Sequence, residues 1–184
     1  MTDPMILTVG HSTHPLDEFV ELLGGADVGA IVDVRRLPGS NRYPWFNEDA
    51  LASSLPAAGI RYRRAASLGG RRRVSRDVPD AVNGLWRNRS FHNYADHALG
   101  AEFAQGLDEL IREDRASEAA IAVMCSEAVW WRCHRRIIAD HLLARGVAVG
   151  HLMPDARIVP AELTPGAQAR EGTVVYPASA DPAP

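Results

Sequence analysis

Four runs of apolar residues, separated by segments with helical periodicity, constrain the fold of this chain more than any other feature. The runs cover residues 5–9, 28–34, 119–124 and 147–153, and residues 60–64 form a further strand-like segment. Strands that are apolar throughout, rather than at every second residue, are typical of a parallel sheet covered on both faces. Between them, the spacing of apolar residues predicts helices near residues 15–23, 47–58, 94–112 and 131–145.

Strands that alternate with helices in this way indicate right-handed β-α-β units. We therefore predict the α/β fold class: a single three-layer domain with a mainly parallel sheet of about five strands, spanning residues 1–154. Residues 155–184 are rich in proline and weakly periodic, which predicts a C-terminal tail that is partly irregular, with one short strand near residues 173–176. A chain of 184 residues can bury a stable core without disulfides or metal.

Composition excludes several classes of function. Every one of the 20 cationic side chains is arginine, so a Walker-A phosphate loop and any lysine Schiff base are absent. The first residues lack a cationic run ahead of a long apolar segment, and no stretch reaches the ~20 apolar residues of a membrane span. We expect a cytoplasmic protein with reduced cysteines, no membrane partner and no cofactor; the sequence leaves its oligomeric state open.

Polar side chains follow the predicted strands where each one ends. His11 and Ser12 come after the first strand, Asp33 and Arg35 after the second, Arg63 and Arg64 near the third, and Cys125 and Glu127 after the fourth. Ligands of parallel sheets bind beyond the carboxyl ends of the strands, so we expect the site there. For Ser12 the alternative is a cap of the following helix, and for Asp33 and Arg35 it is a structural ion pair.

Cys125 leaves a buried strand and enters a loop that leads to a helix. Backbone N–H groups at a helix start lower the pKa of a thiol, so Cys125 could be a nucleophile. We predict it to be more nucleophilic than Cys133, which the periodicity places inside the helix expected from residue 131. Two alternatives stay open: Cys125 is a small buried apolar residue, or the two cysteines bind a metal with His11 and His134.

Arginine is concentrated in one part of the chain. Between Arg35 and Arg76 there are ten arginines against Glu48 and Asp49, a net charge of +8 in a chain whose total is −3. Aromatic residues lie among them, a combination that suits phosphate groups and stacked bases. We expect Arg71, Arg72 and Arg73 to form a mobile lid or backbone clamp. The alternative is a solvated face whose arginines pair with acids elsewhere in the fold.

The motifs together resemble the DUF488 family, a set of bacterial and archaeal domains of unknown function. They are Thr8–Ser12, Val32–Arg35 with Pro38, Ser40, Phe46 and Asn47, Ala58–Ile60, Leu68–Gly70, Phe91 with Tyr94 and Ala95, Met124–Glu127, and Cys133–Arg135. They occur in order over residues 6–153. The resemblance implies a fold family without implying a reaction.

A weaker likeness is to rhodanese-type sulfurtransferases and the related cysteine phosphatases. In those proteins an Asp-x-Arg strand end is followed by a strand, a cysteine loop and a helix. Phosphatase-type loops place an arginine six residues after the cysteine, whereas Trp131 stands at that position here and Arg132 follows it. The likeness is therefore one of architecture.

We hypothesise an enzyme, a hydrolase or transferase, that acts on a phosphate-bearing substrate such as a nucleotide or nucleic acid. The expected catalytic residues are Cys125, Glu127, His11 and Asp33, and no metal ligand is assigned. The expected substrate-binding residues are Ser12, Arg35, Ser40, Arg42, Arg71, Arg72, Tyr94, Cys133, His134 and Arg135. One alternative is a non-catalytic module that binds nucleic acid or nucleotides. The other is a rhodanese-like sulfur-transfer or redox protein in which Cys133 resolves Cys125.

Overall fold

The computed structural model describes residues 5–178, and its main sheet has six strands in the order β3-β2-β4-β1-β5-β6. The strands are β1 (Met5–Gly10), β2 (Val28–Asp33), β3 (Arg61–Arg64), β4 (Ala120–Cys125), β5 (Ala148–Leu152) and β6 (Ile158–Pro160). Neighbouring strands are parallel except β5 and β6, which are antiparallel. The predicted mainly parallel sheet is confirmed, with one strand more than expected.

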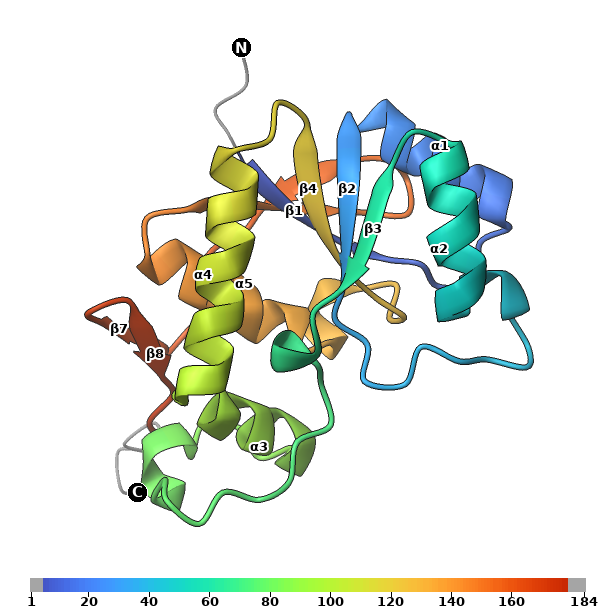
Figure 1. Ribbon diagram of the computed structural model, residues 1–184. Coiled ribbons are helices and arrows are strands. Elements are labelled where there is room, and N and C mark those ends of the chain that lie inside the picture. Colours follow the sequence, from blue (N-terminus) through green and yellow to red (C-terminus); the bar gives the residue numbers. More distant parts are fainter. Residues whose placement is uncertain (1–4, 179–184) are drawn as a thin grey trace.

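Helices cover both faces of this sheet, which confirms the three-layer α/β domain (Figure 1). Helices α1 (Leu16–Gly25) and α2 (Glu48–Ala57) pack on one face, and α3 (Arg89–His97), α4 (Ala101–Arg115) and α5 (Arg135–Ala144) on the other. Ile31 packs with the first group and Val32 with the second. Each central strand thus buries side chains on both faces, which explains why its sequence is continuously apolar.

Two predicted helices have different bounds in the structure. The segment 94–112 belongs to two helices, α3 and α4, because the chain turns at residues 98–100 and Gly100 becomes the N-cap of α4. The helix expected from residue 131 begins only at Arg135, after a single 3-10 turn at Trp130–Arg132. Cys133 therefore lies before the first turn of α5 rather than inside a helix.

The segment after residue 154 contributes to the fold. Its strand β6 extends the main sheet, and β7 (Gln168–Arg170) pairs with β8 (Thr173–Val175) in a separate hairpin. The hydroxyl of Tyr176, which is fully buried, donates a hydrogen bond to Asp140 Oδ2 on α5 at 2.8 Å. This contact ties the hairpin segment to the helix that follows the cysteine loop.

The strands end level with one another at the carboxyl edge. Gly10 of β1 lies opposite Cys125 of β4, and Asp33 of β2 lies opposite Met124 of β4 and Arg64 of β3. The side chains that follow these residues therefore meet above the same edge, as the sequence predicts.

Candidate functional site

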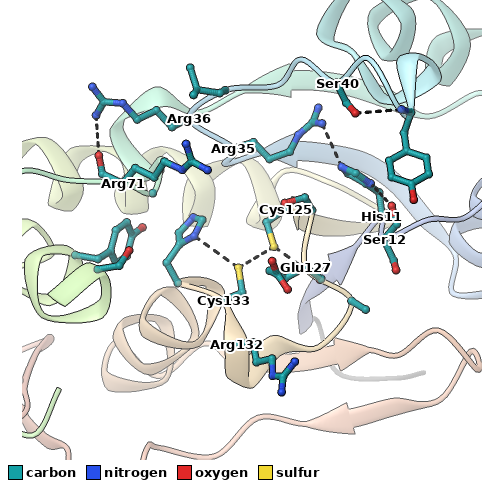
Figure 2. Close-up of a pocket in the computed structure, with 18 of the residues that line it drawn as sticks. His11, Ser12, Arg35, Arg36, Ser40, Arg71, Cys125, Glu127, Arg132 and Cys133 are labelled. Atoms are coloured by element: carbon teal, nitrogen blue, oxygen red, sulfur yellow. Dashed lines mark hydrogen bonds between the residues drawn. The ribbon is translucent and has the colours of Figure 1, made fainter. Parts of the chain in front are cut away.

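A cavity of about 700 Å³ opens at this edge (Figure 2). Ten of the expected site residues line it: His11, Ser12, Arg35, Ser40, Arg71, Tyr94, Cys125, Glu127, Cys133 and His134. Asp33, Arg42, Arg72 and Arg135 do not. The cavity thus collects groups from the ends of β1, β2 and β4, from α3 and from the start of α5.

The loops after β1 and β4 are joined through their backbones. His11 N–H donates to the Cys125 carbonyl at 3.0 Å, and Ser12 N–H donates to the Ser126 carbonyl at 3.1 Å. A Cβ atom on Gly10 would lie 1.7 Å from the Glu127 carbonyl oxygen. Only glycine at position 10 therefore allows the cysteine loop to approach β1 so closely.

We predict that Gly10→Ala lowers the free energy of unfolding by about 1–3 kcal/mol, because backbone must move to admit the methyl group. Urea unfolding followed by circular dichroism measures this. Gly24→Ala is the matched control: it lies in α1 with open space around the added Cβ, and alanine there favours the helix. Equal stability of the Gly10 and Gly24 variants would contradict the tight approach of the two loops.

Asp33 holds Arg35 in place from below the cavity. Arg35 Nη2 lies 2.6 Å from Asp33 Oδ2, Arg35 Nε lies 2.9 Å from Asp33 Oδ1, and the Tyr62 hydroxyl donates to Oδ2 at 2.7 Å. Asp33 is fully buried. This arrangement matches the structural ion pair left open by the sequence, and the catalytic role expected for Asp33 stays a prediction.

His11 continues this network on its other side. Arg35 Nη1 donates to His11 Nε2 at 3.2 Å, and since an arginine can only donate, the ring proton must be on Nδ1, which donates to the Ser12 carbonyl at 2.9 Å. Burial lowers the pKa of His11 to about 4, and its ring stacks on Phe46 at 4.1 Å. With both nitrogens engaged and the ring neutral at pH 7, His11 is suited to orienting Arg35 rather than to carrying a proton.

The two cysteines meet in the lining of the cavity. Cys125 Sγ and Cys133 Sγ are 2.7 Å apart, both thiols are free, and the residues are 3% and 4% exposed. Arg135 N–H points at Cys133 Sγ from 3.4 Å, and His134 Nδ1 lies 3.6 Å from it. Cys133 therefore faces a backbone N–H and the His134 ring at the start of α5, whereas Cys125 faces chiefly Cys133.

These surroundings shift the pKa values of the two thiols in opposite directions. Burial and the hydrogen bond to Cys133 raise the pKa of Cys125 well above its ordinary value. For Cys133, burial opposes ionisation, but the Cys125 thiol, His134 and the Arg135 charge outweigh it and hold the pKa well below its ordinary value. The start of α5 at Arg135, which presents a backbone N–H to Cys133, therefore favours Cys133 over Cys125 as the more acidic thiol, and which thiol is the more nucleophilic stays a prediction.

Arg135 supplies the balancing charge. Its side chain is 1% exposed, and its Nη2 donates to the Glu127 carbonyl at 2.6 Å, while Nε has no hydrogen-bond partner among residues 5–178. No carboxylate of the described residues forms a salt bridge with it. The charge of this buried cation contributes to lowering the pKa of Cys133.

Half of the ten arginines between Arg35 and Arg76 form ion pairs. Five of these arginines pair with acids, as the alternative reading of the sequence expects: Arg35 with Asp33, Arg61 and Arg63 with Glu113, Arg64 with Glu48, and Arg72 with Glu102. Arg72 also donates to the carbonyls of Ala66, Ser67 and Gly69, so it anchors its loop instead of serving as part of a lid. Arg42 lies over the Tyr43 ring at 5.5 Å.

Most of the charged side chains that line the cavity are arginines. Arg36, Arg71 and Arg132 line the cavity with Arg35, and Glu127 is the single acid among the described residues that line it. Arg36 Nη1 donates to the Arg71 carbonyl at 3.1 Å, which links the loop after β2 to the loop at residues 69–71. The charged side chains of the lining are therefore mostly cationic.

Three expected binding residues also shape the wall. Ser40 Oγ accepts a hydrogen bond from Tyr43 N–H at 3.0 Å, and the Tyr94 hydroxyl donates to the Leu68 carbonyl at 2.6 Å. Burial raises the pKa of Tyr94 well above its ordinary value, so it stays neutral beside the His134 ring. Ser12 is not a helix cap: α1 has Pro15 at its N-cap, and Ser12 adopts a φ of 50° at the cavity rim.

Sequence reasoning did not place several cavity residues in the site: Thr13, Arg36, Leu37, Gly39, Tyr43, Gly70, Ser90, Phe91, Ser126, Ala128 and Arg132. Arg36 and Arg132 adjoin residues that it did select. Ser90 and Phe91 come from α3, whose start at residue 89 the apolar spacing did not indicate. Among residues 5–178, no group of three or more His, Cys, Asp and Glu side chains is arranged to hold a metal ion.

Comparison with known proteins gives one match. A family model described as a domain of unknown function, DUF488, matches residues 15–142. No curated protein and no solved structure matches the chain. In the part of the chain that the structure describes, no helix is long and apolar enough to cross a membrane.

Proposed function

The chain belongs to the DUF488 family of unknown function, and we propose that it is an enzyme in which the Cys133 thiolate acts on an anionic, phosphate-bearing substrate. The observation that carries this proposal is a buried sulfur with a lowered pKa at the wall of a cation-lined cavity. A thiolate is the reactive form of cysteine, and enzymes keep such groups ionised with nearby positive charge and helix N-termini.

The cavity lining supports an anionic substrate. Arg36, Arg71 and Arg132 have no carboxylate partner among residues 5–178, so their guanidinium groups are available to phosphate oxygens. The volume of about 700 Å³ suits a ligand the size of a nucleotide. Tyr43 and Phe91 are aromatic residues of the lining. Arg42 lies over one face of Tyr43 and Trp86 stacks on one face of Phe91, so a base would stack on the opposite faces.

In the proposed reaction the Cys133 sulfur attacks the substrate phosphorus. A sulfur–phosphorus bond forms, the bond to the leaving oxygen breaks, and water later releases phosphate and restores the thiol. Glu127 is the carboxyl group in the lining that could exchange a proton with the leaving group and with water. Cys125 holds the thiolate through its hydrogen bond, and Asp33 and His11 orient Arg35 toward the anion.

The test is turnover by cysteine variants. We expect phosphate release from at least one member of a panel of aryl phosphates, nucleotides and short single-stranded nucleic acids. Cys133→Ser should lower kcat by about hundredfold or more with little change in affinity for inorganic phosphate, because it removes the nucleophile and keeps the cations. Cys125→Ser, the matched control, should keep measurable turnover, and thermal unfolding checks that both variants fold.

The alternative of a non-catalytic anion-binding module uses the same arginines but has no need of the thiolate. It predicts salt-sensitive binding of a nucleotide or nucleic acid that Arg36→Ala and Arg71→Ala weaken. Binding without phosphate release from any member of the panel, unchanged in Cys133→Ser, would favour that alternative over the enzyme.

A further inference from the structure

We propose that Cys125 and Cys133 form a peroxide-reactive dithiol, in which Cys133 reacts with a small hydroperoxide and Cys125 then closes an intramolecular disulfide. This activity goes beyond the proposed function, because it needs the sulfur pair and not the phosphate-bearing substrate. The pair was considered from the sequence with the roles reversed, Cys133 resolving Cys125. The geometry points to Cys133 as the attacking sulfur.

The first support is the distance between the two sulfurs. Figure 2 shows the side chains of Cys125 and Cys133 pointing toward each other. Their Sγ atoms are 2.7 Å apart. A disulfide bond is about 2.05 Å long, so a shift of less than about 1 Å would join them. Cys125 ends β4 and Cys133 precedes α5, so the loop between them, rather than a strand or helix, can take up this shift.

The second support is the difference between their surroundings. Cys133 Sγ receives the Arg135 N–H at 3.4 Å and lies 3.6 Å from His134 Nδ1, both at the start of α5. Cys125 Sγ has Cys133 and, at 3.9 Å, the Glu127 carbonyl as neighbours. One sulfur is thus kept as a thiolate, and the other is a neutral thiol that already touches it.

The third support is access. The two residues are 3% and 4% exposed, and both line the cavity, so a reagent reaches them only from the cavity side. A hydroperoxide presents two linked oxygens of small size and fits this approach. A folded protein carrying a surface disulfide does not.

The chemistry balances with the hydroperoxide as oxidant. Cys133 S⁻ attacks the terminal oxygen, a sulfur–oxygen bond forms, the oxygen–oxygen bond breaks, and the departing alkoxide or hydroxide takes a proton from water. Cys133 is now a sulfenic acid. The Cys125 sulfur then attacks the Cys133 sulfur, the disulfide forms, and the hydroxyl group leaves with the Cys125 proton as water. The pair has lost two electrons, and the hydroperoxide has been reduced to an alcohol or water.

The test is intact-mass measurement of the full chain after treatment with hydrogen peroxide. We expect the wild-type chain to lose two hydrogen atoms, to regain them with a dithiol reductant, and to yield on digestion a peptide pair that links Cys125 to Cys133. Cys125→Ser should instead hold a sulfenic acid at Cys133 that dimedone traps. Cys133→Ser should react at least about tenfold more slowly, because the remaining thiol lacks the donors of α5.

Wild-type protein that gains oxygen without losing hydrogen, or that forms disulfides only between two chains, would overturn the proposal. Because the wild-type mass and peptide map suffice for this decision, a variant that fails to fold does not affect it. Disulfide formation without phosphate release from any substrate would leave the dithiol standing and remove the proposed function. Phosphate release from a chain whose thiols resist peroxide would support the proposed function and overturn the dithiol proposal.

Discussion

Replacing Asp33 by alanine should lower the free energy of unfolding by about 3–5 kcal/mol, because it leaves a buried arginine without its counter-ion. Asp33 is fully buried and accepts hydrogen bonds from Arg35 N, Nε and Nη2 and from the Tyr62 hydroxyl. In the variant all of these donors lose their common acceptor. Urea unfolding at pH 7 measures the loss.

Two further variants separate the ion pair from general damage to the fold. Asp155→Ala removes the acid of an exposed pair with Arg157 and should change stability by about 1 kcal/mol or less. Asp33→Leu combined with Arg35→Met replaces both charges with apolar groups and should recover part of the stability that Asp33→Ala loses. A loss in Asp33→Ala no larger than in Asp155→Ala would contradict the role assigned to the buried pair.

Acidification from pH 7 to pH 5 should destabilise the protein by at least about 3 kcal/mol, because three buried histidines stay neutral in the fold. Burial lowers the pKa of His11 to about 4, of His141 to about 3 and of His151 to about 4. His141 packs on Phe103, and neither of its ring nitrogens is hydrogen-bonded within residues 5–178. His151 stacks on Trp130, and its Nδ1 lies 2.7 Å from Thr8 Oγ1.

The direction of the effect follows from proton binding. Below an ordinary pKa of about 6.5 the unfolded chain takes up a proton on each of these histidines, whereas the folded chain does not until the pH nears about 4. The stability they allow at neutral pH is therefore lost as the pH falls from about 6.5 to about 4, by about 1–2 kcal/mol per histidine at pH 5.

His141 offers the sharpest test of this pH dependence, since it is fully buried and its ring nitrogens make no hydrogen bond among the described residues. In His141→Leu the free energy of unfolding should fall less between pH 7 and pH 5 than in the wild type, by the about 1–2 kcal/mol that one histidine contributes. Urea unfolding at several pH values gives the slope of the free energy of unfolding against pH for the wild type and for the variant. Identical slopes for the two proteins would show that His141 titrates alike in the folded and unfolded states.

Much of the fold followed from the sequence for a local physical reason. A strand buried on both faces must be apolar at every position, and a helix on its surface must be apolar at every third or fourth, so β1, β2, β4 and β5 and most helices could be recognised along the chain. Strand β6 could not, because its residues are mostly exposed and it gains its place by pairing with β5 at the sheet edge.

The sequence by itself also determined the edge at which the site lies, since the carboxyl ends of parallel strands share one side of a sheet. It placed His11, Arg35, Cys125 and Glu127 there, and all four line the cavity. It did not determine their roles. Asp33, two residues from Arg35, turns below the cavity to hold that arginine, because its carboxylate meets Tyr62 from the neighbouring strand.

Only the tertiary structure decided which groups surround each thiol. The sequence puts Cys125 and Cys133 eight residues apart, but the ionisation depends on where α5 begins and on which groups point at each sulfur. A start at Arg135 brings a backbone N–H and a buried guanidinium to Cys133. Acidity is set by distances of a few ångströms between groups from different elements, and those distances exist only once the chain is folded.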